Sequence, residues 1–117
     1  MVLGLTSDED RRAACHRMVD EQIRARGIRH DVLLAAMREV PRHAFVPAAH
    51  QAMACEDRPL SIGHGQTISQ PYMVAAMTAA LNPQASDCVL DVGTGSGYQA
   101  AVLARLAHEV LSVELIP

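Results

Sequence analysis

The positions of the apolar residues divide the chain into a helical first part and a strand–helix–strand second part. In the first part, apolar side chains recur three or four positions apart, the period typical of amphipathic helices. In the second part, two short apolar runs rich in β-branched residues, 88–92 and 109–113, flank a helical stretch. Such a unit requires a parallel strand pair with a right-handed crossover. The sequence therefore predicts an α/β protein with a mostly helical part over 1–86 and a β-α-β unit over 87–117.

Capping residues, glycines and prolines set the expected bounds of the helices. Ser7 has capping-box spacing with Asp10, and Gly27 is a typical helix stop, so one helix is expected between Ser7 and Gly27. Asp31 is expected to cap the next helix, which Pro41 ends. The remaining expected elements are a loop over 41–65 with one short helix at 48–54, a loop over 65–71, a helix over 70–81 and a helix over 98–107. The methionines on these helices, Met18, Met37, Met73 and Met77, are interpreted as core residues.

Composition excludes several classes of protein. The 117 residues are 50% hydrophobic and 20% charged, with a net charge of −3, which argues against a nucleic-acid surface. Three widely spaced cysteines exclude a disulfide scaffold and a cysteine zinc site, and they fit a reducing compartment. The six histidines lack metal-ligand spacing, so no metal site is expected. No apolar run is long enough to span a membrane, and the N-terminus does not resemble a signal peptide, so a cytoplasmic protein without a membrane partner is expected.

A glycine-rich turn follows the first apolar run and carries the strongest chemical signal. Gly93, Gly95 and Gly97 separate a predicted strand from a predicted helix, where glycines let the backbone approach a ligand closely. Glu114 follows Gly95 by 19 positions, the spacing at which an acid accepts ribose hydroxyls in nucleotide sites. The third glycine comes one position earlier than in a dinucleotide fingerprint. A glycine turn without a ligand remains the alternative, and Asp91 is either a ligand contact or a cap of the following helix.

The turn resembles the first motif of class I S-adenosylmethionine-dependent methyltransferases, with Asp91 two residues ahead of G-x-G-x-G. Further segments resemble the protein-L-isoaspartate O-methyltransferase family, above all Gly65-Gln-Thr-Ile-Ser-Gln-Pro71, and the resemblance covers nearly the whole chain from about residue 16. The other resembling segments are 18–28, 33–37, Val40-Pro-Arg-His-Ala-Phe-Val-Pro47, Asp57-Arg-Pro-Leu60 and 89–99.

This resemblance implies a Rossmann-like fold and a methyl transfer from S-adenosyl-L-methionine to the α-carboxyl of L-isoaspartyl residues in damaged proteins. It implies that Ser69 is the active-site serine, whereas the residue pattern by itself favours Ser69 as the cap of the next helix. The expected cofactor-binding residues are Thr67, Ile68, Asp91, Gly93, Thr94, Gly95, Ser96, Gly97, Tyr98 and Glu114. The substrate carboxylate is ionised at neutral pH, because its reference pKa is about 4. Catalysis is therefore expected to rely on positioning, without a general base.

The family's sheet continues beyond the strand that ends near Glu114, so the chain is expected to be the N-terminal portion of a truncated fold, with residues 87–117 as the first β-α-β of the cofactor-binding domain. Two parallel strands do not form a stable sheet alone, which predicts a homo-oligomer or a strand-swapped assembly and little turnover by this form. Two alternatives stay open: a non-catalytic module for cofactor binding or assembly, and a methyltransferase acting on a small molecule.

Overall fold

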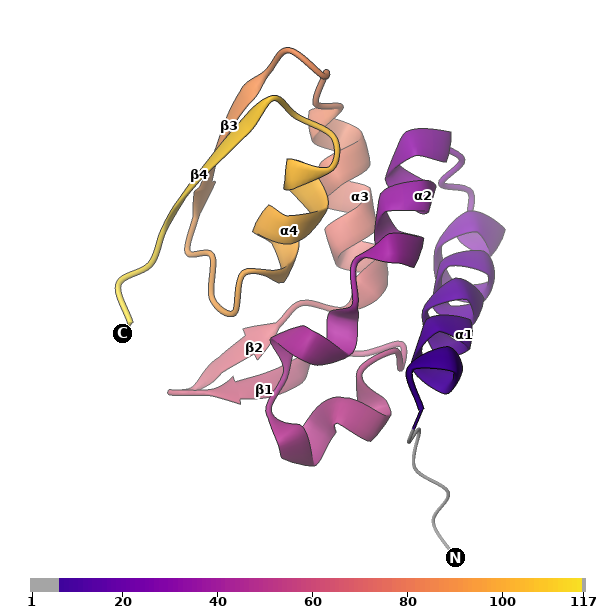
Figure 1. Ribbon diagram of the computed structural model, residues 1–117. Helices are drawn as coiled ribbons and strands as arrows, with labels where there is room; N and C mark the ends of the chain where they lie inside the picture. Colours follow the sequence, from indigo (N-terminus) through magenta and orange to yellow (C-terminus); the bar gives the residue numbers. More distant parts are fainter. Residues whose placement is uncertain (1–6, 117) are drawn as a thin grey trace, which may run out of the picture.

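A long helical segment opens the part of the chain that the computed structural model describes, residues 7–116, while residues 1–6 and Pro117 lie outside it (Figure 1). The expected cap is confirmed, because the Ser7 hydroxyl oxygen accepts a hydrogen bond from the Asp10 N–H at 3.0 Å. Helix α1 (Asp8–Met18) continues as a π-helical turn, η1 (Val19–Ile23), and a 3₁₀ turn, η2 (Arg24–Arg26). Gly27 ends the segment with φ +99°. The expected single helix thus has the right ends, but its hydrogen-bond pattern changes at Val19.

Helix α2 (Asp31–Glu39) differs from expectation only in its cap. The expectation that Asp31 caps the helix is wrong: His30 is the cap, and its Nδ1 accepts a hydrogen bond from the Leu33 N–H at 3.2 Å. Asp31 is instead the first helical residue, where its negative charge suits the helix dipole.

The segment between α2 and the next long helix contains a hairpin that the sequence pattern did not predict. After two 3₁₀ helices, η3 (Arg42–Phe45) and η4 (Ala48–Met53), strands β1 (Leu60–Gly63) and β2 (Gln66–Ile68) pair antiparallel. The expectation of loops over this stretch is therefore wrong at both strands. Strand β1 has four residues and β2 has three, which is too few to display an alternating apolar and polar pattern.

Helix α3 (Pro71–Leu81) begins with proline at its first position and ends at Asn82, which has φ +49°. The expected β-α-β unit follows, as β3 (Cys88–Val92), α4 (Tyr98–Ala104) and β4 (Glu109–Val113). Strands β3 and β4 pair parallel, as predicted, with a continuous register from Cys88–Glu109 to Val92–Val113. Helix α4 ends three residues before its expected end.

The helices and the strand pair lie on two sides of the molecule (Figure 1). Helices α1, α2 and α3 lie side by side, and α4 lies between this group and the β3–β4 pair. The buried hydrophobic core consists mainly of Ala, Val, Leu, Ile and Met side chains, and Tyr98 is its one aromatic residue among those that the structure describes. Met18 and Met37 are in this core, but the expectation is wrong for Met73 and Met77, which are exposed on α3.

Three further features concern the described residues as a whole. No helix within residues 7–116 has the length and apolar character needed to cross a membrane. All three cysteines are free thiols. Within the same residues, no three or more His, Cys, Asp or Glu side chains are grouped so that they could hold a metal ion.

Candidate functional site

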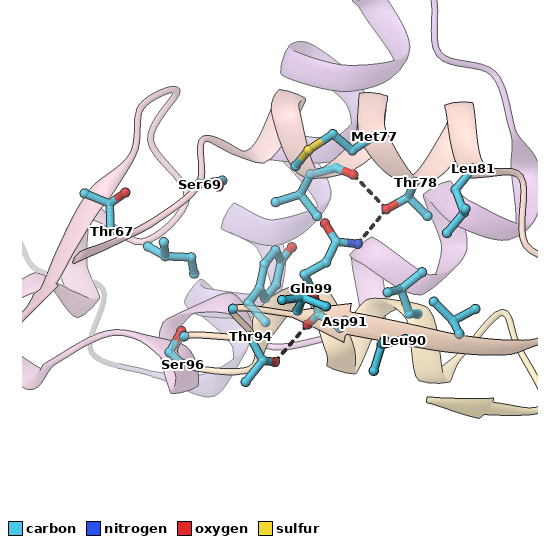
Figure 2. Close-up of a pocket in the computed structure, with 18 residues that line it drawn as sticks. Thr67, Ser69, Met77, Thr78, Leu81, Leu90, Asp91, Thr94, Ser96 and Gln99 are labelled. Carbon is cyan, nitrogen blue, oxygen red and sulfur yellow. Dashed lines mark hydrogen bonds between the residues drawn. The ribbon is translucent and has the colours of Figure 1, made fainter. Parts of the chain in front are cut away.

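A cavity of about 320 Å³ lies between α3, strand β3 and the glycine turn, and the end of β2 closes one side (Figure 2). Its volume falls within the range of small-molecule sites. Nine residues that the sequence singled out line it: Thr67, Ile68, Ser69, Asp91, Gly93, Thr94, Gly95, Ser96 and Tyr98. Gly97 and Glu114 do not line it. The structure thus brings together two segments, 67–69 and 91–98, that lie more than twenty positions apart in the sequence.

The three glycines of the turn have positive φ angles, the conformation that favours glycine. Gly93, Gly95 and Gly97 have φ values of +73°, +59° and +93°, a region that side chains other than glycine rarely adopt. Gly95 also lies close to the hairpin, because a Cβ atom added there would be 3.3 Å from Ile62 Cδ1. The N–H groups of Gly93 and Thr94 both donate to the carbonyl of Val113, at 2.9 and 3.2 Å. The turn is therefore fixed to the end of β4.

Asp91 acts on the turn and does not cap helix α4. Its carboxylate accepts a hydrogen bond from the Thr94 hydroxyl at 2.8 Å (Figure 2). The N-cap of α4 is Gly97, which has no side chain, so the alternative that Asp91 caps this helix is wrong. Asp91 remains half-buried in the cavity wall, where it is the only acidic side chain.

Glu114 follows β4 directly and is joined to the turn by a short hydrogen bond. The Gly95 N–H donates to Glu114 Oε2 at 2.6 Å, and the Ile116 N–H donates to Oε1 at 3.3 Å. These backbone donors, Gly95 first, hold the pKa of the Glu114 carboxyl below its ordinary value. Glu114 lies beside the cavity and lines a neighbouring open hollow with Gly93 and Leu115. Its charge is therefore fixed at the edge of the site.

Ser69 lines the cavity, and its hydroxyl is not used as a helix cap. The cap of α3 is Gln70, because the residue before a proline is forced into an extended conformation and the helix starts at Pro71. The expectation that Ser69 caps the helix is therefore wrong. No hydrogen bond within the described residues engages the Ser69 hydroxyl, whereas its carbonyl accepts from Arg42 Nη2 at 2.7 Å. The side chain of Ser69 is exposed at the cavity (Figure 2).

A second contact fixes the same loop from the protein surface. Asp57 accepts a hydrogen bond from Gln70 Nε2 at 2.6 Å and forms an ion pair with Arg26. The Arg26 guanidinium, followed by the Gln70 amide, holds the pKa of the Asp57 carboxyl below its ordinary value. Asp57 thus links η2 to the residue that follows Ser69. The arrangement anchors the loop at two successive positions.

Two polar residues of the cavity wall, Thr78 and Gln99, were missed by sequence reasoning. Thr78 donates its hydroxyl proton to the Val74 carbonyl at 2.7 Å, so Gln99 Nε2 must be the donor in its 2.7 Å contact with Thr78 Oγ1 (Figure 2). Gln99 Oε1 is then buried and without a partner among the described residues. A ligand N–H or O–H in the cavity would satisfy this acceptor. The only sequence signal was that α3 carried polar Thr78 on an otherwise apolar surface.

Comparison with known proteins assigns the family. The model of the protein-L-isoaspartate(D-aspartate) O-methyltransferase family matches residues 13–117. The chain belongs to this family. A curated protein-L-isoaspartate O-methyltransferase of Methanoculleus marisnigri is 62% identical over 86% of this chain and 46% of its own length. The relative from a Picosynechococcus strain is 56% identical, again over 86% of this chain and 46% of its own length. The chain spans about half the length of the curated relatives it matches.

Solved structures confirm the predicted Rossmann-like methyltransferase fold. A Plasmodium falciparum structure, described as a protein-L-isoaspartate O-methyltransferase in complex with S-adenosyl-L-homocysteine, has a TM-score of 0.75 and 26% identity. It covers 87% of this chain, which in turn covers 49% of that protein. A second protein-L-isoaspartate O-methyltransferase structure has a TM-score of 0.73 and 28% identity, over 88% of this chain and 33% of its own. The order of helices and the parallel strand pair found here are therefore those of this family's fold.

Proposed function

We propose that the protein transfers a methyl group from S-adenosyl-L-methionine to the α-carboxyl of L-isoaspartyl residues in damaged peptides and proteins. One observation carries this proposal: the exposed Ser69 hydroxyl and the glycine turn open on the same cavity, at whose edge Glu114 is hydrogen-bonded to Gly95. Membership of the family supports the reaction, and the S-adenosyl-L-homocysteine bound to the Plasmodium relative supports the cofactor.

The glycine turn and Glu114 would bind the methyl donor. Glu114 retains acceptor capacity for ribose hydroxyls, because a carboxylate offers about four lone-pair sites and two N–H groups occupy only part of them. Gly93 and Gly95 both line the cavity, and at Gly93 no atom lies within 4 Å of the position that a Cβ would take, so a ligand can approach the backbone there. The other residues proposed to contact the donor are Thr67, Ile68, Asp91, Thr94, Ser96, Gly97 and Tyr98.

The residues of the cavity fit a positively charged donor. Asp91 supplies the one acidic side chain, and no Arg or His side chain lines the cavity. The unpartnered, buried Gln99 Oε1 provides an acceptor that a ligand can satisfy. S-adenosyl-L-methionine supplies a methyl group already activated on a sulfonium. The wall therefore matches the ligand in charge and offers it a hydrogen-bond acceptor.

The task of the protein would be to position the substrate carboxylate and to exclude water. An isoaspartyl carboxylate is ionised at neutral pH, since its reference pKa is about 4, so no group must remove a proton. The free Ser69 hydroxyl would donate a hydrogen bond to one carboxylate oxygen and orient the other toward the methyl group. Two contacts, from Arg42 and from Asp57, hold the Ser69 loop in place for this purpose.

The test is methanol release from an isoaspartyl peptide, measured side by side with the 117-residue chain and with the natural reading frame that contains it. We expect methylation of the isoaspartyl peptide and none of its aspartyl counterpart. Ser69→Ala is expected to lower kcat by at least about tenfold, because a positioned hydrogen bond to a charged group contributes about 1.5–3 kcal/mol. Ser61→Ala, at an exposed serine of β1, is the matched control. Absence of isoaspartyl methylation in both preparations would contradict the proposal.

We also propose that the chain assembles through β3 and β4, in a compartment that keeps its thiols reduced, such as the cytoplasm. Leu90 and Val92 on β3 and Leu111 and Val113 on β4 are exposed, and such side chains are usually covered in a parallel sheet. A second copy packed on this face would cover them. Sedimentation velocity tests this: we expect a dimer or larger species at micromolar concentration, and a monomer throughout would contradict it.

A further inference from the structure

Arg42 is a fully buried arginine for which no carboxylate partner exists within residues 7–116. Burying a charge without a counter-ion is costly, so such residues are rare unless their hydrogen bonds serve a specific purpose. Burial lowers the pKa of the guanidinium from its ordinary value. Arg42 nonetheless stays protonated at neutral pH, as arginines in proteins do.

The Arg42 guanidinium joins three segments, two of which line the cavity. Nε donates to the Ala54 carbonyl at 2.6 Å, and Nη2 donates to the Ser69 carbonyl at 2.7 Å. The guanidinium carbon lies 4.9 Å from the centre of the Tyr98 ring, in cation–π contact. Tyr98 lines the cavity and is the first residue of α4, directly after Gly97. One side chain thus contacts the end of η4, the Ser69 loop and the residue that follows the glycine turn.

The shape of the guanidinium is essential to this arrangement. Its planar fork presents donors in fixed directions and stacks on an aromatic face, whereas a lysine ammonium is a single point charge on a flexible stem. A lysine at position 42 could reach one carbonyl but not both carbonyls and the ring. Asp57, the second anchor of the loop, is exposed, and the ion pairs of exposed groups contribute little. Arg42 is therefore the stronger of the two anchors.

We propose that Arg42 is a positioning residue: by contacting the Ser69 carbonyl and the Tyr98 ring together, it fixes the Ser69 loop relative to the glycine turn. The methyl donor and the substrate carboxylate would then meet at the correct separation only when this guanidinium is present. The inference rests on the proposed function for the roles of Ser69 and the turn. Its geometric core, the rigidity of two loops around one side chain, does not depend on that function.

The test uses Arg42→Lys and a variant of similar stability loss, Leu34→Ala, which truncates a buried α2 side chain that takes no part in the site. Amide hydrogen exchange is measured first. We expect Arg42→Lys to speed exchange of residues 66–70 and 95–99 by about tenfold, which corresponds to about 1.4 kcal/mol at 25 °C. For each protein, the exchange rate in these two loops is divided by the rate in the rest of the chain. Leu34→Ala is expected to leave this ratio at its value in the parent protein. If the two variants have the same ratio, the inference is overturned, whether or not the protein binds the donor.

Chemical rescue provides the second measurement. In Arg42→Ala, millimolar ethylguanidinium can occupy the vacated space, whereas ethylammonium at the same concentration lacks the fork. We expect ethylguanidinium alone to restore slow exchange at residues 66–70 and to recover at least half of the affinity for S-adenosyl-L-homocysteine. Equal effects of the two cations would contradict the positioning role. Slow exchange restored without any binding by the parent protein would instead contradict the proposed function and leave the positioning role supported.

Discussion

Helix α2 and the β3–β4 strand pair carry the same kinds of apolar side chain in opposite environments. Leu33, on α2, is 0% exposed, whereas Leu90 and Val92 on β3 are 60% and 72% exposed. On β4, Leu111 and Val113 are each 52% exposed. The helical side is therefore stabilised by its own packing, while the strand pair is held mainly by its backbone ladder and by α4. The candidate site lies between the helical side, at α3, and the strand pair, at β3.

This difference separates the residues that stabilise the protein from those that serve the site. The cavity has one wall on α3, which belongs to the packed helical side, and another on β3 and the glycine turn. Changes in the helical core should reduce stability. Changes in the turn should reduce ligand binding, and changes at the exposed side chains of β4, which do not line this cavity, should affect neither in a dilute monomer.

The largest expected effect is on the packed side. Leu33→Ala is expected to lower the free energy of unfolding by about 2–5 kcal/mol, the range for a fully buried leucine that leaves a cavity. Val32→Ala, at the preceding and 59% exposed position of the same helix, is the matched control. Its expected change is within about 0.5 kcal/mol. Urea denaturation followed by circular dichroism measures both, and similar losses would refute the contrast between buried and exposed positions.

The second prediction concerns the turn. Gly95→Ala and Gly65→Ala both place a side chain at positive φ, +59° and +70°, and each is expected to lose about 1–2 kcal/mol of stability. Only at Gly95 would the new Cβ meet another residue, 3.3 Å from Ile62 Cδ1, and only Gly95 lines the cavity. We therefore expect Gly95→Ala alone to weaken binding of S-adenosyl-L-homocysteine in calorimetry. Equal affinities of the two variants would show that the turn is not part of the binding site.

The third prediction is a pH dependence that arises from Glu114. Because the Gly95 N–H lowers the pKa of the folded carboxyl, this contact stabilises the protein fully above the ordinary glutamate pKa of 4.5. The stabilisation is lost as the pH falls through the lowered value. The difference in stability between the parent and Glu114→Gln should thus be present at pH 6 and shrink at pH 3. A stability difference that grows as the pH falls would show that folding does not lower the pKa of Glu114.

The smallest expected effect is on the strand side. Leu115 is 96% exposed directly after Glu114, so Leu115→Ser is expected to change the free energy of unfolding by less than about 0.5 kcal/mol. Thermal unfolding at a concentration where sedimentation shows a monomer measures it. A loss above about 1 kcal/mol in that monomer would contradict the expectation.

The sequence predicted the parts of the fold that local signals determine. Ser7 and Gly27 bound the first helical segment as expected, and strands β3 and β4 lie at their predicted residues, because caps, glycines and β-branched runs act over a few positions. The hairpin was missed because its strands are too short to show periodicity. The cap of α3 was misplaced by one residue, because Pro71 forces Gln70 into the extended conformation of a cap.

The candidate site was predictable only in part, for a different reason. Gly93, Gly95 and Ser69 belong to local motifs, and the structure places them around one cavity. Arg42 and Gln99 act through contacts with residues 27 and 21 positions away, at Ser69 and Thr78. No pattern along the chain reveals such contacts. The one available signal for Arg42 was a single charged residue amid the prolines and apolar residues of segment 40–47.

The central claim is that the glycine turn and Glu114 bind the methyl donor. Isothermal titration of S-adenosyl-L-homocysteine into the parent, Glu114→Gln and Glu109→Gln tests it most directly, since Glu109 lies at the other end of β4 and outside the cavity. We predict that Glu114→Gln weakens binding about tenfold or more, as loss of a charge-assisted hydrogen bond does. Glu109→Gln should stay within about twofold of the parent, as expected for a distant surface position. Equal affinities for all three proteins would contradict the account.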